Sequence, residues 1–173
     1  YGTKRSYFTM KLESALNYYN VPWEHVTKGP DVTELVEARS GTHQIPVLQT
    51  PENWMINDTT PIISMMDARY PLRRMFPTGP SGVLVHLVEE LLDEWLSRTM
   101  VHYRWNYEAS AREVAKAIMA EMIPDADEET STHMQEMVFG FGRKACRANG
   151  LDSDHQKKMT EEEYEGILTA AQE

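Results

Sequence analysis

A dense run of helix-breaking residues divides this chain into two halves of different character. Tyr70-Pro71 is followed closely by Phe76-Pro77-Thr78-Gly79-Pro80, and proline both lacks a backbone N–H and clashes with the preceding helical turn. We therefore predict a first domain at residues 1–70, a linker at residues 71–80 and a second domain at residues 81–173. The first half mixes helix and strand signals, whereas the second predicts helices alone.

The first half alternates helical periodicity with short apolar runs that are bounded by turn residues. Helices are indicated by apolar residues at three- and four-residue spacing, and strands by short runs that end at proline, glycine or asparagine. In chain order we expect a helix over Phe8–Tyr19, a strand over Val21–Thr27, a helix over Asp31–Arg39, a hairpin of residues 45–48 and 54–56, and a helix from Asp58 to about Arg69.

This order packs a mixed sheet between helices only if a further strand precedes Tyr1. We therefore expect the chain to lack its natural start and the first strand of the domain. In the second half, periodic apolar residues predict helices over Val83–Tyr107, Ala109–Ile123, Ser131–Asn149 and Thr160–Ala171. The last of these has no stop signal, so we also expect the helical domain to be incomplete.

Composition excludes several classes of function. The formal net charge of −10 disfavours nucleic acid as a partner, because phosphate binding depends on clustered Lys and Arg. The single cysteine, Cys146, allows no internal disulfide, which favours the cytoplasm or another reducing compartment. No apolar run approaches the roughly 20 residues that span a bilayer, so we predict no membrane insertion.

Three segments, in matching order and spacing, resemble the glutathione transferase family. After Tyr1-Gly2, the run Ser6-Tyr7-Phe8-Thr9-Met10-Lys11-Leu12 resembles the family's active-site turn and the start of its first helix. Ile45-Pro46-Val47-Leu48 resembles the V-P-x-L element, whose proline is cis, and Asn57-Asp58-Thr59-Thr60-Pro61-Ile62 resembles the E-S-x-A-I element at a helix start. The resemblance implies an α/β thioredoxin-like N-terminal domain followed by an all-α C-terminal domain.

The resemblance also implies a role for each matching residue. Helix N-termini favour anions such as a thiolate or a carboxylate, which suits these positions independently. For the hydroxyl that activates the thiol of glutathione, Ser6 is the first choice, with Tyr7 second and Thr9 third. The implied glutathione-binding residues are Gln44, Ile45, Pro46 and Val47 for the peptide backbone, and Asp58 and Thr59 for the γ-glutamyl end.

Plain structural interpretations stand beside these roles. Ser6, Thr9 and the pair Asp58-Thr59 are residue types that commonly cap helices without any ligand. Pro46 also suits an ordinary edge position in the trans form. In the second half, His86, Glu90, Asp93 and Glu94 lie on one predicted helix and could suggest a metal site. No partner Glu-x-x-His motif is present on another helix, so we predict no metal site.

Three functions follow as hypotheses. The first is a glutathione transferase that uses glutathione as co-substrate to attack a small electrophile. The alternative is a non-catalytic subunit or adaptor of the same fold in a larger protein assembly, and the family also implies a homodimer. A thiol-disulfide oxidoreductase ranks last, because neither Ser6 nor Thr9 supplies an attacking sulfur.

Overall fold

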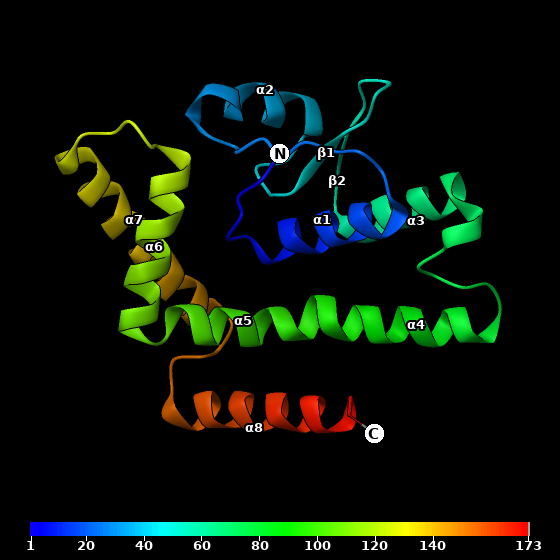
Figure 1. Ribbon diagram of the computed structural model, residues 1–173. Coiled ribbons are helices and arrows are strands. Elements are labelled where there is room, and N and C mark those ends of the chain that lie inside the picture. Colours follow the sequence, from blue (N-terminus) through cyan, green and yellow to red (C-terminus); the bar gives the residue numbers. More distant parts are fainter. Residues whose placement is uncertain (173) are drawn as a thin grey trace. The chain divides into compact units, whose positions relative to one another are not determined.

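The computed structural model describes residues 1–172, which form mainly helices with one small hairpin (Figure 1). Pro71–Arg73 is a single 3-10 turn, and Leu91–Trp95 is a π-helical stretch between two α-helices. In chain order the elements are α1 (Tyr7–Tyr19), α2 (Pro30–Ser40), β1 (Val47–Gln49), β2 (Met55–Asn57), α3 (Thr59–Arg69), α4 (Pro80–Glu90), α5 (Leu96–Trp105), α6 (Glu108–Met122), α7 (Glu128–Ala148) and α8 (Asp154–Ala170).

The chain divides into two compact units. The first comprises Tyr1–His86 together with Ala120–Asp125, which are the end of α6 and the loop after it. The second comprises Leu87–Met119 and the chain from Ala126 onward. The domain limits expected from the sequence place a linker at residues 71–80, and they remain a prediction.

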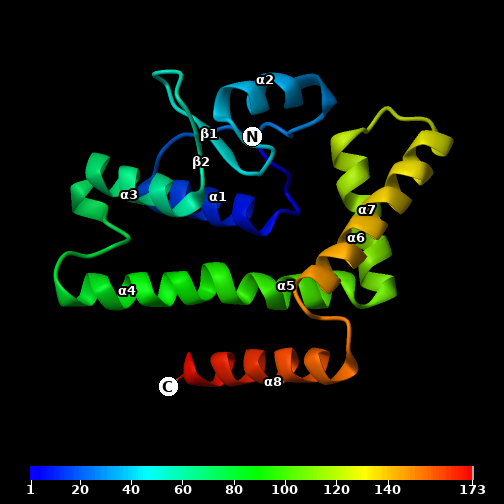
Figure 2. The same ribbon diagram turned by 180° about the vertical axis from the view of Figure 1, so that it is seen from behind.

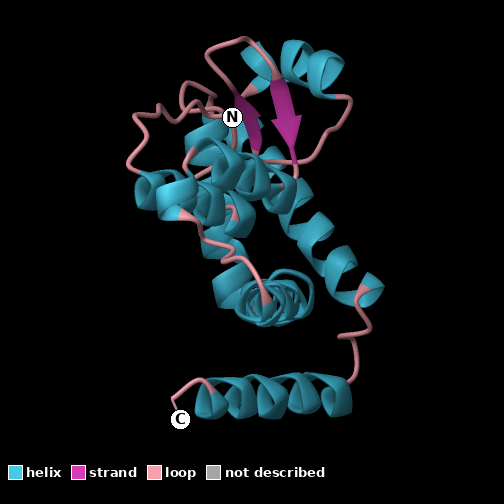
Figure 3. Ribbon diagram, turned by 90° about the vertical axis from the view of Figure 1, so that its right-hand side faces the viewer, coloured by secondary structure: helices cyan, strands magenta, loops and turns pink. Residues whose placement is uncertain are grey.

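The sheet of the first unit is a hairpin with one further short pairing at its edge. β1 and β2 are antiparallel, with Val47 opposite Asn57, so the predicted hairpin is confirmed (Figure 3). On the free edge of β1, the Tyr1 nitrogen donates to the Val47 carbonyl over 2.7 Å, and the Val47 N–H donates to the Tyr1 carbonyl over 2.9 Å. Gly2 then pairs in parallel with Thr27.

The predicted strand over Val21–Thr27 is wrong over most of its length. Only a single bridge forms, at Thr27. A strand persists where a neighbouring backbone takes up its hydrogen bonds. Here the neighbour is Gly2, which bonds to the Val26 carbonyl within this segment and to the Lys28 N–H just after it.

The helices of the first unit begin and end at residues with the expected capping chemistry. The Ser6 hydroxyl accepts from the Thr9 N–H over 3.3 Å at the start of α1. Gly41, at a left-handed φ of 72°, ends α2, where a residue without Cβ is under no strain. The Asp58 carboxylate accepts from the Thr60 N–H over 3.2 Å at the start of α3.

The core of the first unit lies between α1 and α3, which run side by side (Figure 2). Apolar side chains fill it, including Leu12, Leu16, Ile62, Ile63 and Met66. Within this core the Tyr19 hydroxyl donates to Asp67 Oδ1 over 2.6 Å. The same carboxylate accepts from the N–H groups of Met75 and Phe76 over 2.7 and 2.9 Å. Asp67 of α3 therefore links α1, through Tyr19, to the segment at Met75 and Phe76 that follows α3.

The second unit is built around α5, which packs against α7 and α8 (Figure 1). Its buried cluster consists of Trp105, Ala111, Ala115, Cys146 and Leu151. His102 of α5 is fully buried, and its Nε2 lies 2.8 Å from Glu161 Oε1 of α8. This polar pair joins α8 to α5.

Local capping explains where the later helices depart from their predicted limits. α7 and α8 begin before the predicted Ser131 and Thr160, because Asp127 and Ser153 cap earlier N-termini with their side chains. The predicted helix over Val83–Tyr107 forms as α4 and α5 joined by the π-helical stretch. Within residues 1–172, no helix is both long and apolar enough to span a membrane, and no group of three His, Cys, Asp or Glu side chains is placed to hold a metal ion.

Candidate functional site

The register of the sheet brings the three predicted site segments to one end of the hairpin. Val47 lies opposite Asn57 in antiparallel strands. Pro46, which comes before β1, and Asp58, which follows β2, therefore lie at the same end of the hairpin. Tyr1 exchanges both backbone hydrogen bonds with Val47, so it is also antiparallel to β1. The chain after Tyr1 therefore runs toward this same end, where it leads into α1.

Ser6 is held at the N-terminus of α1 by a tight turn. The turn spans Thr3–Ser6 and is closed by the Ser6 N–H, which donates to the Thr3 carbonyl over 3.0 Å. The half-buried Ser6 hydroxyl uses a lone pair to cap the Thr9 N–H. A capping hydroxyl keeps its own O–H to donate. Ser6 can thus stabilise an anion at a helix end that already favours negative charge.

The two alternative hydroxyls differ from Ser6 in their surroundings. Tyr7 is half-buried, with its ring edge-on to Phe8 at a centroid distance of 5.2 Å. Thr9 is only 4% exposed, and its Oγ1 bonds to no other group within the described residues. It packs against Gly2, where a Cβ atom would lie 2.4 Å from Thr9 Oγ1. Thr9 is therefore buried against the Gly2 backbone, whereas Ser6 and Tyr7 are half-buried.

The second segment presents a free stretch of backbone. The Ile45–Pro46 peptide bond is cis, as the resemblance implies. Both backbone groups of Val47 are used by Tyr1, and the Gln44 N–H donates to Thr42 Oγ1 over 3.1 Å. The N–H and C=O of Ile45 bond to nothing in the part of the chain that the structure describes. Ile45 is thus the residue with both groups available to an extended peptide.

The third segment places a carboxylate and a helix N-terminus together. Asp58 is exposed and combines a φ of 70° with a ψ of 124°, a sparsely populated backbone conformation that lies outside the αL region. Thr59 is buried, and its backbone N–H belongs to the first turn of α3. Asp58 therefore remains the exposed charged group of this segment.

Residues far away in the sequence complete the surroundings of the Ser6 turn. Glu121, in the last turn of α6, accepts from the Lys4 N–H over 2.8 and 3.1 Å, one distance to each carboxylate oxygen. Its Oε1 also accepts from the Thr27 hydroxyl over 3.3 Å and lies 3.4 Å from His25 Nε2. The other ring nitrogen of His25 lies 2.6 Å from Glu13 Oε1. Sequence reasoning missed this cluster, since nothing local connects residues 4 and 121.

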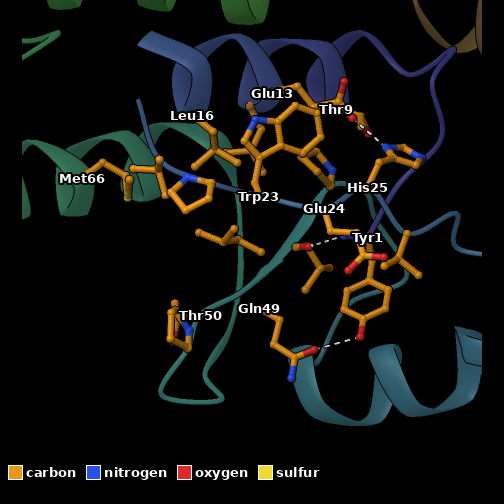
Figure 4. A pocket seen from close by; sticks show the side chains of 18 of the residues that line it. Tyr1, Thr9, Glu13, Leu16, Trp23, Glu24, His25, Gln49, Thr50 and Met66 are labelled. Carbon is orange, nitrogen blue, oxygen red and sulfur yellow. Dashed lines mark hydrogen bonds and ion pairs between the residues drawn. The ribbon is translucent and has the colours of Figure 1, made fainter. Parts of the chain in front are cut away.

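A cavity of about 460 Å³ lies in the first unit between α1, the segment that precedes Thr27, β1 and the end of α3 (Figure 4). Its lining includes Pro46, Val47 and Thr9 but not Ser6 or Asp58. Arg69 also lines it and lies 3.1 Å from Glu52. Hydrogen bonding from this guanidinium lowers the pKa of the Glu52 carboxyl to about 2. The cavity therefore borders the predicted site only through the cis-proline segment and Thr9.

The comparisons with known proteins concern the N-terminal part of the chain. Residues 1–74 match the protein family described as glutathione S-transferase, N-terminal domain. The match spans all three predicted site segments and the hairpin, and it confirms the expected relation to the glutathione transferase superfamily. No curated protein and no solved structure matches the chain.

Proposed function

Because its first 74 residues belong to the glutathione S-transferase family of N-terminal domains, we propose that this protein binds glutathione and activates its thiol for attack on a small electrophile. The observation that carries the proposal is the convergence at one end of the hairpin. The Ser6 turn, the free backbone of Ile45 and the exposed Asp58 carboxylate all lie there. These are a hydroxyl, an extended backbone edge and an anion, which match the three parts of a γ-glutamyl tripeptide thiol.

Activation in this proposal means favouring the thiolate. A cysteine thiol has a pKa of about 8.5 and is mostly protonated at neutral pH, where it is a weak nucleophile. The Ser6 O–H would donate to the sulfur at the positive end of α1, which stabilises the thiolate relative to the thiol. The thiol proton goes to solvent, the sulfur forms a bond to the electrophilic carbon, and the leaving group departs with its electron pair.

The remaining groups hold the tripeptide in the proposed complex. The N–H and C=O of Ile45 would pair with the peptide backbone, as one strand edge pairs with another. Asp58 would pair with the γ-glutamyl ammonium, while the Thr59 N–H would donate to the neighbouring carboxylate. The Thr60 N–H already donates to Asp58, and Pro61 has no N–H. Gln44, Pro46 and Thr59 would shape the site around these contacts.

Isothermal titration with glutathione tests the binding site directly. Wild-type protein should show one saturable site, and Asp58→Asn should weaken it about tenfold through loss of a charge pair. Asparagine has nearly the same size as aspartate and keeps an oxygen that can accept from the Thr60 N–H, so the change isolates the charge. Asp31→Ala, at the exposed start of α2, is the matched control and should bind as wild type. Equal binding by Asp58→Asn would refute the assigned role.

Steady-state conjugation of chlorodinitrobenzene tests the activating hydroxyl. Ser6→Ala should lower kcat by roughly 10²–10³, the usual effect of removing one donor to a developing anion, while glutathione still binds. Ser14→Ala removes an exposed serine of the same helix and should leave kcat unchanged. An unchanged kcat in Ser6→Ala would exclude Ser6 as the activator, and Tyr7→Phe would then be the next variant to measure.

The exposed face of α4 favours the alternative, a non-catalytic subunit of a larger assembly. Leu84 and Leu87 are 65% and 62% exposed, and Val83 and Val88 lie beside them. Contiguous exposed apolar side chains are typical of protein interaction sites. Light scattering on wild type and on Leu84→Lys tests this alternative. Self-association that the variant abolishes, in a protein without glutathione binding, would favour it over catalysis.

A further inference from the structure

We propose that Glu121 is a positioning residue for thiol activation, which acts by fixing the turn that carries Ser6. This inference rests on the proposed function. Both carboxylate oxygens of Glu121 accept from the Lys4 N–H, at 2.8 and 3.1 Å. Lys4 is the second residue of the Thr3–Ser6 turn, so the contact holds the turn at its centre.

The turn has few other restraints of its own. Lys4 and Arg5, its two central residues, are exposed, whereas Thr3 before them is buried. The hydrogen bond from the Ser6 N–H to the Thr3 carbonyl closes the turn but does not orient it relative to the rest of the unit. A charged acceptor forms stronger hydrogen bonds than a neutral one. Buried Thr3 holds the start of the turn, and Glu121 supplies the charged acceptor for its exposed central part.

Glu121 is itself held in place from two sides. Its side chain is only 15% exposed, and it accepts from the Thr27 hydroxyl, next to the bridge between Thr27 and Gly2. His25 lies between two carboxylates, with Nε2 3.4 Å from Glu121 and Nδ1 2.6 Å from Glu13 of α1 (Figure 4 shows the His25 and Glu13 side chains). The cluster thus connects the turn to the sheet edge and to α1.

The direction of the expected effect separates positioning from simple electrostatics. A carboxylate near a thiolate disfavours it, so removal of the Glu121 charge alone would lower the pKa of a bound thiol. Loss of positioning has the opposite sign, because a displaced Ser6 hydroxyl no longer stabilises the thiolate. Displacements of about 1 Å remote from the reacting atoms can reduce rates about a hundredfold.

The test compares Glu121→Ala and Glu121→Gln with wild type and with Glu113→Ala, which removes an exposed glutamate from the same helix. Hydrogen exchange of the peptide that contains residues 1–8 reports the turn, and thiolate absorbance of bound glutathione against pH reports activation. We expect faster exchange, a bound-thiol pKa raised by roughly one unit, and a 10- to 100-fold lower kcat/KM in Glu121→Ala. Glu121→Gln retains one acceptor oxygen, so its values should lie between these and wild type.

Each outcome has a definite meaning. Faster exchange together with a raised thiol pKa supports the inference. Unchanged hydrogen exchange overturns it, and so does faster exchange with an unchanged or lowered thiol pKa. If Glu121→Ala fails to fold, the same comparison is made with Glu121→Gln. Wild-type protein that binds no glutathione would overturn the proposed function and this inference together, and that result is visible before any variant is compared.

Discussion

Removal of the Asp67 side chain should destabilise the first unit more than most single substitutions. The Asp67 carboxylate is 1% exposed and accepts three hydrogen bonds, from the Tyr19 hydroxyl and from the N–H groups of Met75 and Phe76. In Asp67→Ala these three donors lose this acceptor, and the Tyr19 hydroxyl keeps the Ile63 carbonyl at 3.3 Å. Each unsatisfied buried donor costs about 1–3 kcal/mol.

The net effect is smaller than the sum of these three losses. Relief from burying a charge opposes it, and water can enter the space that the carboxylate leaves. We expect Asp67→Ala to lower the free energy of unfolding by about 3–5 kcal/mol, a large part of the 5–15 kcal/mol that is typical of a domain. Tyr19→Phe removes one donor and leaves the carboxylate its other two, so we expect about 1.5–3 kcal/mol.

Urea unfolding followed by circular dichroism measures both changes, and the double variant completes a thermodynamic cycle. The two substitutions should be coupled by about 1–2 kcal/mol, since the two side chains are in direct contact. Asp31→Ala, at an exposed helix start, is the control for loss of an aspartate and should stay within about 0.5 kcal/mol of wild type. A change below about 1 kcal/mol in Asp67→Ala would refute this account of the core.

The same pair predicts a pH dependence at the alkaline end. Burial, and then the hydrogen bond to Asp67, raise the pKa of Tyr19 above its ordinary value of 10.0. A raised pKa in the folded state stabilises the fold below the pKa of the unfolded state, and this stability is lost as the pH rises above it. The free energy of unfolding of wild type should therefore fall above about pH 10, and Tyr19→Phe should show a smaller fall.

Three further predictions concern the second unit. Cys146 is 2% exposed, and burial raises the pKa of its thiol. Iodoacetamide should therefore label the native protein slowly and the urea-unfolded protein at the rate of an ordinary cysteine, and mass spectrometry measures both rates. Gly142→Ala should lower the free energy of unfolding by about 1–3 kcal/mol in urea titrations, because its Cβ atom would lie 2.2 Å from the Trp105 ring. Gly140 has open space around it, so Gly140→Ala should stabilise the same helix. Hydrogen bonds from Tyr107 and then from His102 lower the pKa of the Glu161 carboxyl from 4.5. The carboxylate should therefore stabilise the fold above pH 4.5, and this stability should be lost as the pH falls. In thermal melts, Glu161→Gln should show a smaller decrease of the melting temperature at acid pH than wild type.

Much of the candidate site could be predicted from residues that are close together in the chain. Ser6 and Asp58 are caps, and a cap acts on N–H groups two or three residues ahead, so its signal is complete within one short segment. The cis-proline element is likewise complete within four residues, Ile45-Pro46-Val47-Leu48. The burial of Thr9 could not be predicted, because it depends on how closely the Gly2 backbone approaches α1.

The sequence by itself determined the helices, their caps and the position of the hairpin, since propensity, capping and turn chemistry all act within a few residues. The tertiary structure alone decided which distant groups meet. The segment over Val21–Thr27 had strand-like residues but found a partner only near Thr27, and the Lys4 N–H found its acceptor at Glu121. A hydrogen bond needs two groups at one place, and for residues far apart in the chain that place is set by the path of the whole backbone.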